Sequence, residues 1–514
     1  MNQVFHIFQK DMRHFWREST VSVALVAVFA WSEVRSWRAP EDFSRGAVFF
    51  QQGLPMILLF LSWWFLIARV VQDESLVGDR QFWITPPYEW KKLLAAKILF
   101  AAVFINLPLF IAQVVLLAKA GFNPASYLSG LLWMQLLLTV FLLLPTAAVA
   151  AVTSTVVQMG LASLLVILYI GGTAALSSYI PSSSFSFDSD DLQPAILVGA
   201  SLVVIAWQYA RRKTAKSRSL IVGAAAAIVL LVVATPYGIL IEHEYPLLGA
   251  GQRLPVMLAM APPAPHAAVE VDDSPKKDTV QIDIPWTLSG QADDSIVGIK
   301  GMMIAIEAPD SVRWDSAWAS QYISLYPGQR RMQLSFELPK AFFERVKSAL
   351  VKIRISLLVT VYHDKNRRDF VTPRGEFVLP DVGLCFAQAG YSNTVHCRAA
   401  MRRPSSFFVS SDLSLTTCPN WRRDPPTKPG EMGHVWDLNS DSGPAEFGLS
   451  PIQSFDLYLS TANSSVSSRG ICPGTPLVLS NPEPVQAFRT TLQMDGVRLD
   501  DYRYVLGQFE FNLP

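Results

Sequence analysis

The stretch LIVGAAAAIVLLVVATPYGILIEHE, residues 220–244, contains the last long apolar run of the chain and separates two kinds of sequence. Before it, apolar runs of membrane-helix length follow one another. After it, apolar and polar residues alternate, as in strands with one buried face. Hydrophobic residues make up 51% of the 514 residues, a high share for a soluble protein of this length. The pattern predicts a membrane α-helical bundle followed by an all-β domain.

A membrane-spanning helix needs roughly 20 mostly apolar residues to cross about 30 Å of hydrocarbon. About seven segments meet this requirement, and they predict a transmembrane domain over residues 21–241. Glu33 and Arg35 interrupt the outer end of the first segment. The expected spans are 18–36, 52–72, 93–117, 127–152, 156–179, 194–210 and 220–241.

Basic residues indicate the orientation, because cytoplasmic flanks carry an excess of Lys and Arg. The N-terminal arm and the loops after the second and sixth spans are basic, whereas residues 181–193 hold Asp and no Lys or Arg. These basic flanks predict that the N-terminus lies in the cytoplasm of a bacterial inner membrane. An odd number of spans then puts the C-terminal domain in the periplasm. A net charge of +1 suggests no nucleic-acid partner. The basic residues are Lys10, Arg13, Arg17, Arg80, Lys91, Lys92, Arg211, Arg212, Lys213, Lys216 and Arg218.

The four cysteines, Cys385, Cys397, Cys418 and Cys472, all lie in the C-terminal part, which agrees with a compartment where disulfides form. Four cysteines allow three pairings. The segments VGLCFAQ and TVHCRAA flank a turn-like AGYSN, and a symmetric hairpin centred on Tyr391 would bring Cys385 opposite Cys397. Cys418 with Cys472 follows by elimination, and free buried thiols are the alternative.

Residues 1–20 have the pattern of an amphipathic helix that lies in the headgroup plane of a bilayer. A helical projection gathers the apolar side chains on one face and Lys10, Arg13 and Arg17 on the opposite face. The alternative is a cytoplasmic extension of the first span. The apolar face comprises Val4, Phe5, Phe8, Met12, Phe15 and Trp16.

The loop between the second and third spans lies in VQDESLVGDRQFWITPPYEWKKLLAAKILF, residues 71–100, and is long, charged and aromatic. Pro86 and Pro87 stop a helix and set a rigid corner, while Gly78 permits a tight bend. A surface that combines charges such as Arg80 with aromatic side chains suits docking against another protein at the membrane edge.

At this loop the sequence resembles the permease subunits of ABC exporters of the second type. Those permeases carry an acidic residue after span two, a Gly four positions on, a run ending in Pro, a hydrophobic pair and a Lys opening span three. The amphipathic N-terminal helix is a second point of resemblance. The matching residues here are Glu74, Gly78, Pro86 or Pro87, Leu93 with Leu94, and Lys97.

The resemblance implies that residues 73–92 hold a coupling helix, which binds an ATP-binding subunit, and that the permease works as a homodimer or heterodimer. ATP is then expected on the partner chain. The sequence itself agrees, because a phosphate-binding loop requires Gly-Lys followed by Ser or Thr, and Gly-Lys occurs nowhere. We therefore expect no cofactor on this chain and no enzymatic activity of its own.

The part after the last span begins with a linker, residues 242–278, rich in Pro and charge. Period-two alternation then predicts two β units, 279–380 and a cysteine-containing 381–514, with a short helix near 340–350. No His-Glu-x-x-His, Cys-x-x-Cys or Gly-x-Ser-x-Gly pattern is present, so we expect no metal and a binding or assembly role. The alternative to transport is a membrane-anchored extracytoplasmic binding or sensory module.

Overall fold

The computed structural model describes most of the chain, and every structural statement below concerns those residues. They are 3–37, 53–73, 89–178, 189–234, 237–248, 257–260, 278–292, 294–325, 331–379, 383–387, 395–401, 407–412, 432–437, 449–457, 459–461, 468–469 and 474–503.

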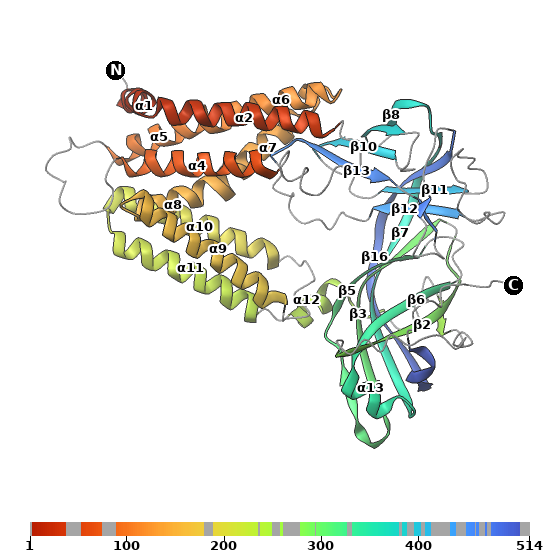
Figure 1. Ribbon diagram of the computed structural model, residues 1–514. Helices are drawn as coiled ribbons and strands as arrows, with labels where there is room; N and C mark the ends of the chain where they lie inside the picture. Colours follow the sequence, from red (N-terminus) through yellow and green to blue (C-terminus); the bar gives the residue numbers. More distant parts are fainter. Residues whose placement is uncertain are drawn as a thin grey trace.

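The N-terminal half is a bundle of long apolar helices, and Figure 1 shows it beside a mostly β C-terminal domain. The helices follow the apolar runs of the sequence, because the backbone groups of such runs pair internally when they leave water. They are α1 (Gln3–His14), α2 (Trp16–Ser36), α4 (Leu54–Gln72), α5 (Trp90–Ala101), α6 (Leu107–Lys119), α7 (Leu128–Leu138), α8 (Leu144–Val152), α9 (Val156–Ser178), α10 (Ser189–Arg211), α11 (Thr214–Ala234) and α12 (Tyr237–Glu244).

Five of the helical segments described are long and apolar enough to cross a membrane: Leu54–Gln72, Trp90–Lys119, Pro124–Val152, Gln193–Arg211 and Thr214–Leu231. A shorter apolar stretch, Val156–Tyr169, lies in α9. Helix α2 is not among the five, since charged residues such as Glu33 and Arg35 lie within it.

The long segments Trp90–Lys119 and Pro124–Val152 each contain one turn of π-helix in front of a proline. Helices α5 and α6 are joined by η3 (Ala102–Asn106), and α7 and α8 by η5 (Thr139–Leu143). Pro108 and Pro145 follow within two residues and sit at the starts of α6 and α8. A π turn widens the helix locally, and such turns are frequent at functional sites.

The seventh expected span, 220–241, corresponds to two helices. Helix α11 begins earlier, at Thr214, and ends at Ala234, and α12 packs on the β domain. Ile241 and Tyr245 are buried against Trp318 and Leu358 of that domain. The sequence has Pro236 between the two helices, and proline lacks the amide hydrogen that would continue a helix.

The β domain contains three antiparallel sheets among the described residues. Their orders are β1-β2-β6, β13-β10-β9-β8, and β15-β14-β12-β11-β16-β7-β3-β4, with β5 also pairing β3. The expected short helix is α13 (Lys340–Val346). The strands are β1 (Met257–Met260), β2 (Thr279–Ser289), β3 (Ser295–Glu307), β4 (Arg313–Asp315), β5 (Ala319–Leu325), β6 (Arg331–Pro339), β7 (Leu350–Val371), β8 (Gly375–Leu379), β9 (Gly383–Ala387), β10 (Val395–Ala400), β11 (Phe407–Asp412), β12 (Met432–Asp437), β13 (Ile452–Leu457), β14 (Leu459–Thr461), β15 (Ser468–Arg469) and β16 (Pro476–Arg498).

The long strands β7 and β16 run through two separate hydrophobic cores. They pair from Pro476 opposite Val371 to Arg498 opposite Leu350. One core joins the β1-β2-β6 sheet, α13 and one half of both strands, and the other lies beneath the β8-β9-β10-β13 sheet. The predicted division near residue 380 therefore falls between strands that share one sheet.

Candidate functional sites at the two ends of the helical bundle

Helix α1 packs against α5 at the end of the bundle that is remote from the β domain (Figure 1). The ring centroid of Phe8 lies 6.4 Å from that of Phe100 and 6.2 Å from that of Phe104. Phe15 also contacts Phe100, at 6.4 Å. Phe8 of α1 and Phe15, which lies between α1 and α2, are both buried, so this face of the predicted interfacial segment faces protein.

Other apolar side chains of the same region remain exposed. Phe5 is 54% exposed, Met12 36% and Trp16 57%. Phe5 and Met12 are seven residues apart in α1 and share one side of that helix, whereas Trp16 is the first residue of α2. The apolar residues found in the sequence are thus divided between a buried face and an exposed face.

A buried ion pair joins α1 to α5. Nζ of Lys97 lies 2.8 Å from Oδ2 of Asp11, and the two side chains are 5% and 0% exposed. A buried charge is costly unless it is paired, so each group requires the other. Lys97 was a candidate coupling residue on sequence grounds, whereas Asp11 was not identified. Its spacing from Phe8 and Phe15 would have put it on the same helical face.

The predicted coupling loop begins at Asp73, immediately after α4, and this residue faces α1. Asp73 lies 3.4 Å from Nζ of Lys10 and 3.7 Å from Nε2 of His14. The start of the loop is therefore held beside the N-terminal helix. The predicted coupling residues Glu74, Gly78, Arg80, Pro86 and Pro87 lie outside the described residues.

The ends of three further helices meet in the same region. Nε and Nη2 of Arg218, near the start of α11, donate to the carbonyl oxygen of Val152 at the end of α8. Gln72 at the end of α4 donates to Oγ1 of Thr153 over 2.9 Å. Arg218, Asp73 at the start of the predicted coupling loop, and α1 thus belong to one end of the bundle.

Inside the bundle, polar side chains form what we call the amide ladder: Asn106, Gln113, Gln135 and Thr139. Nδ2 of Asn106 donates to Oγ1 of Thr139 over 2.8 Å, and this hydroxyl donates to the carbonyl of Gln135. Nε2 of Gln135 donates to Oε1 of Gln113 over 2.8 Å, and Nε2 of Gln113 donates to the carbonyl of Leu449 over 2.9 Å. The sequence analysis did not identify Asn106, Gln135 or Thr139.

The direction of every bond in the amide ladder follows from the backbone carbonyls, which only accept. Because Gln113 must donate to Leu449, its oxygen accepts from Gln135, and Oε1 of Gln135 is left as an acceptor. Likewise Asn106 donates through Nδ2, so its Oδ1 remains as an acceptor. Both oxygens are buried without a hydrogen-bond partner in the described structure. An unpaired buried acceptor costs about 1–3 kcal/mol.

At the other end of the bundle, a segment of the β domain enters between the helices. We call Leu449–Ile452 the plug. Leu449 belongs to the core of the helices, and Ile452 packs with Leu117 and Leu131. Ser450 hydrogen-bonds the carboxyl group of Glu33 in α2. Residues more than 300 positions apart in sequence therefore close this end together.

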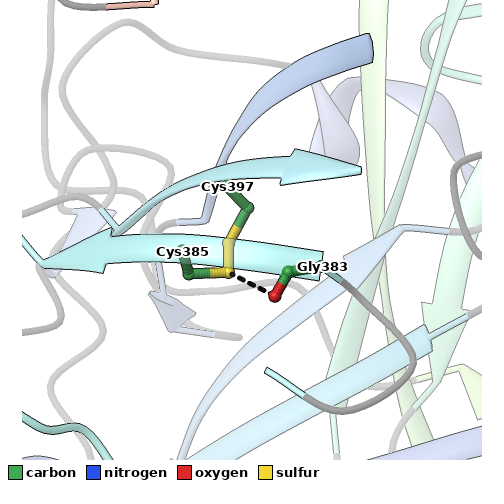
Figure 2. The surroundings of a disulfide bond; sticks show 3 residues. All are labelled: Gly383, Cys385 and Cys397. Atoms are coloured by element: carbon green, nitrogen blue, oxygen red, sulfur yellow. Dashed lines mark hydrogen bonds between the residues drawn. A yellow bond between two sulfur atoms is a disulfide. The ribbon is translucent and has the colours of Figure 1, made fainter. Parts of the chain in front are cut away.

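The sheet that carries the plug is braced by a disulfide, shown in Figure 2. Cys385 in β9 lies opposite Cys397 in β10 and is bonded to it, so the predicted pairing is confirmed. Gly383 has a φ of +143°, and a Cβ there would collide with the carbonyl oxygen of Arg398. The predicted Cys418–Cys472 pair lies outside the described residues.

The outer face of this sheet contacts the helix ends directly. The guanidinium of Arg398 lies 5.8 Å from the ring centroid of Trp37, which follows α2. A Cβ on Gly130 would come within 2.7 Å of Cε of Met401, so α7 and the segment that follows β10 approach closely there. Among the residues described, no group of three or more His, Cys, Asp or Glu could hold a metal ion.

No family model and no curated protein matches the chain. A solved structure with some likeness is the red sea bream transglutaminase, at 10% identity and a TM-score of 0.14. The match covers 56% of this chain and 35% of the transglutaminase, so the chain spans about a third of that protein. A likeness this low carries no argument about fold or function.

Proposed function

We propose that this chain is the membrane-spanning permease subunit of an ABC exporter of the second type, driven by ATP hydrolysed on a separate subunit. The observation that carries the proposal is Asp73, which lies between α4 and the predicted coupling loop and pairs with Lys10 of α1. The start of the loop is paired with α1, and α1 packs on α5. A conformational change in an ATP-binding partner that binds the loop can therefore be transmitted to the helices of the bundle.

The proposed topology has seven crossings, with the N-terminus in the cytoplasm of a bacterial inner membrane and the β domain in the periplasm. Its support is the segregation of charge. Lys10, Lys97 and Arg218 belong to the end remote from the β domain, as the positive-inside rule requires of a cytoplasmic end. Protease added to intact spheroplasts should digest the β domain, and digestion only in inside-out vesicles would refute this orientation.

We assign α1 to the cytoplasmic membrane surface. The exposed Phe5, Met12 and Trp16 can enter the headgroup region while Arg13 and Arg17 contact lipid phosphates. A pair of such permeases, identical or different, would enclose the exit path between them. Chemical cross-linking of the purified protein in nanodiscs tests for this dimer.

Co-purification tests the coupling assignment. The full chain should bring down an ATP-binding subunit, and Glu74→Ala or Pro86→Ala with Pro87→Ala should weaken this association. Glu344→Ala, which removes an exposed carboxylate of the β domain, is the matched control and should leave it unchanged. Undiminished stimulation of the partner ATPase after deletion of residues 73–92 would exclude the coupling role.

A membrane-anchored binding or sensory module is the second candidate. It is favoured by the close attachment of the β domain, through the plug at one point and through Glu242 to Arg489, at 2.9 Å, at another. Such a module would purify with no ATP-binding subunit. The same co-purification therefore separates the two functions.

A further inference from the structure

The amide ladder is a polar site within an apolar bundle. Its four side chains, Asn106, Gln113, Gln135 and Thr139, carry no charge. Gln113 is 1% exposed and Gln135 8%, yet Oε1 of Gln135 has no partner among the described residues. The buried side-chain atoms of the site that have no partner at all, Oε1 of Gln135 and Oδ1 of Asn106, are acceptors, so the group that would satisfy them is a donor.

The π turns η3 and η5 adjoin this site. Asn106 is the last residue of η3 and Thr139 is the first residue of η5, and a hydrogen bond joins them. The backbone is thus locally widened on both helices where the acceptors lie. Structural packing alone would be served better by apolar side chains here, because they leave no acceptor unpaired.

The plug closes the site from the side of the β domain. The Leu449 carbonyl accepts a hydrogen bond from Nε2 of Gln113, and the Leu449 side chain packs in the core of the helices. Strand β13 begins at Ile452 and pairs with β10, which carries Cys397. The plug therefore leads directly into the disulfide-braced sheet.

We infer that the amide ladder is a binding site for an uncharged group that donates hydrogen bonds, such as a hydroxyl or a primary amide, and that Leu449–Ile452 is the plug that closes it. In the closed state the carbonyl of Leu449 accepts a hydrogen bond from Gln113. Withdrawal of the plug frees Gln113 and opens a path to Gln135. This deepens the proposed transport function by naming a chemical class, but the test below needs no ATP-binding subunit, so either idea can fail alone.

The experiment measures access to Thr139→Cys in the full chain in lipid nanodiscs. The probes are three methanethiosulfonates, with hydroxyethyl, methyl and trimethylammonioethyl groups. Peptide-resolved mass spectrometry reads labelling at residue 139, so the native cysteines do not interfere. Rates are divided by those of Leu165→Cys, which is 67% exposed on α9 and measures intrinsic reactivity in lipid.

Labelling at residue 139 should be slow with the plug intact and at least about tenfold faster when Leu449→Gly and Ile452→Gly remove its side chains. Gln113→Leu keeps a side chain of similar size but removes the hydrogen bond to the carbonyl of Leu449, so it should give a smaller increase. Val378→Gly, at an exposed position of the same sheet, is the control and should give none. Equal rates with and without the plug would overturn the closure, and so would rapid labelling of the intact protein.

The chemical class is tested in the plug-free variant. The hydroxyethyl reagent should react faster than the methyl and trimethylammonioethyl reagents after division by the Leu165→Cys rates. The added change Gln135→Leu should abolish its advantage over the methyl reagent. Equal rates for all three, or an advantage that survives Gln135→Leu, would overturn the assignment of the ladder to an uncharged donor.

Discussion

Nε2 of Gln113 in α6 donates a hydrogen bond of 2.9 Å to the carbonyl oxygen of Leu449, 336 positions later in the chain. The donor is a buried helix residue, and the acceptor belongs to the segment that precedes β13. One bond thus links the interior of the helical bundle to the disulfide-braced sheet. A change in either partner should be felt in both parts of the protein.

Gln113→Leu should lower the free energy of unfolding by about 1–3 kcal/mol, because it leaves the Leu449 carbonyl and Nε2 of Gln135 without partners. Thermal unfolding in detergent, followed by tryptophan fluorescence, measures the loss. Val115→Leu on the exposed side of α6 is the control and should change the midpoint little. Equal midpoints for the two variants would show that the bond contributes nothing.

Lys97→Met and Asp11→Asn should each destabilise the protein by about 3–5 kcal/mol, because each removes one partner of a buried ion pair. The double variant should lose less than the sum, which a double-mutant cycle detects. Lys92 and Glu89 form an exposed pair at 2.8 Å, so Lys92→Met should cost at most about 1 kcal/mol. Additive losses at Lys97 and Asp11 would contradict the pairing.

Removing the Cys385–Cys397 disulfide should destabilise the β domain. The bond closes a loop with a sequence separation of 12, and its loss costs about 3 kcal/mol in the chain-entropy model. Cys385→Ser with Cys397→Ser should lower the thermal midpoint, as should reduction of the native protein. Non-reduced peptide mapping should link the two cysteines, and recovery of either in another link would refute the pairing.

Ile241→Ala should loosen the connection between the helices and the β domain. Ile241 is fully buried with Trp318 and Leu358, and truncation of such a side chain costs about 2–5 kcal/mol. Leu247→Ala removes a side chain that is 65% exposed and should have little effect. Faster limited proteolysis between the two parts in the first variant, but not in the second, is the expected result.

Alkaline pH should weaken the β domain through Tyr502. Burial, aided by the negative charge of Asp501, raises the pKa of Tyr502 above its ordinary value. The unfolded chain therefore loses the phenol proton first, so stability falls as pH rises past about 10 and levels off above the folded pKa. Tyr502→Phe should reduce the decline between pH 9 and 11, and an unchanged slope would exclude this cause.

Local sequence patterns were sufficient to predict individual secondary-structure elements. Val280, Ile282 and Ile284 alternate with polar residues, as period-two strands do, and all three side chains are buried in β2. The disulfide could also be predicted from the sequence, because Cys385 and Cys397 flank one short hairpin. In each case the residues that interact are near neighbours in sequence, so spacing alone indicates their contact.

The sequence by itself determined that this protein has apolar helices followed by alternating strands, since burial of apolar residues imposes those periods on any chain. The tertiary structure alone decided that Asp11 pairs with Lys97 and that Leu449 meets Gln113. These partners are far apart in sequence, and no period relates them. Their contacts arise only when helices and sheet pack together, because a desolvated charge or amide then requires a partner.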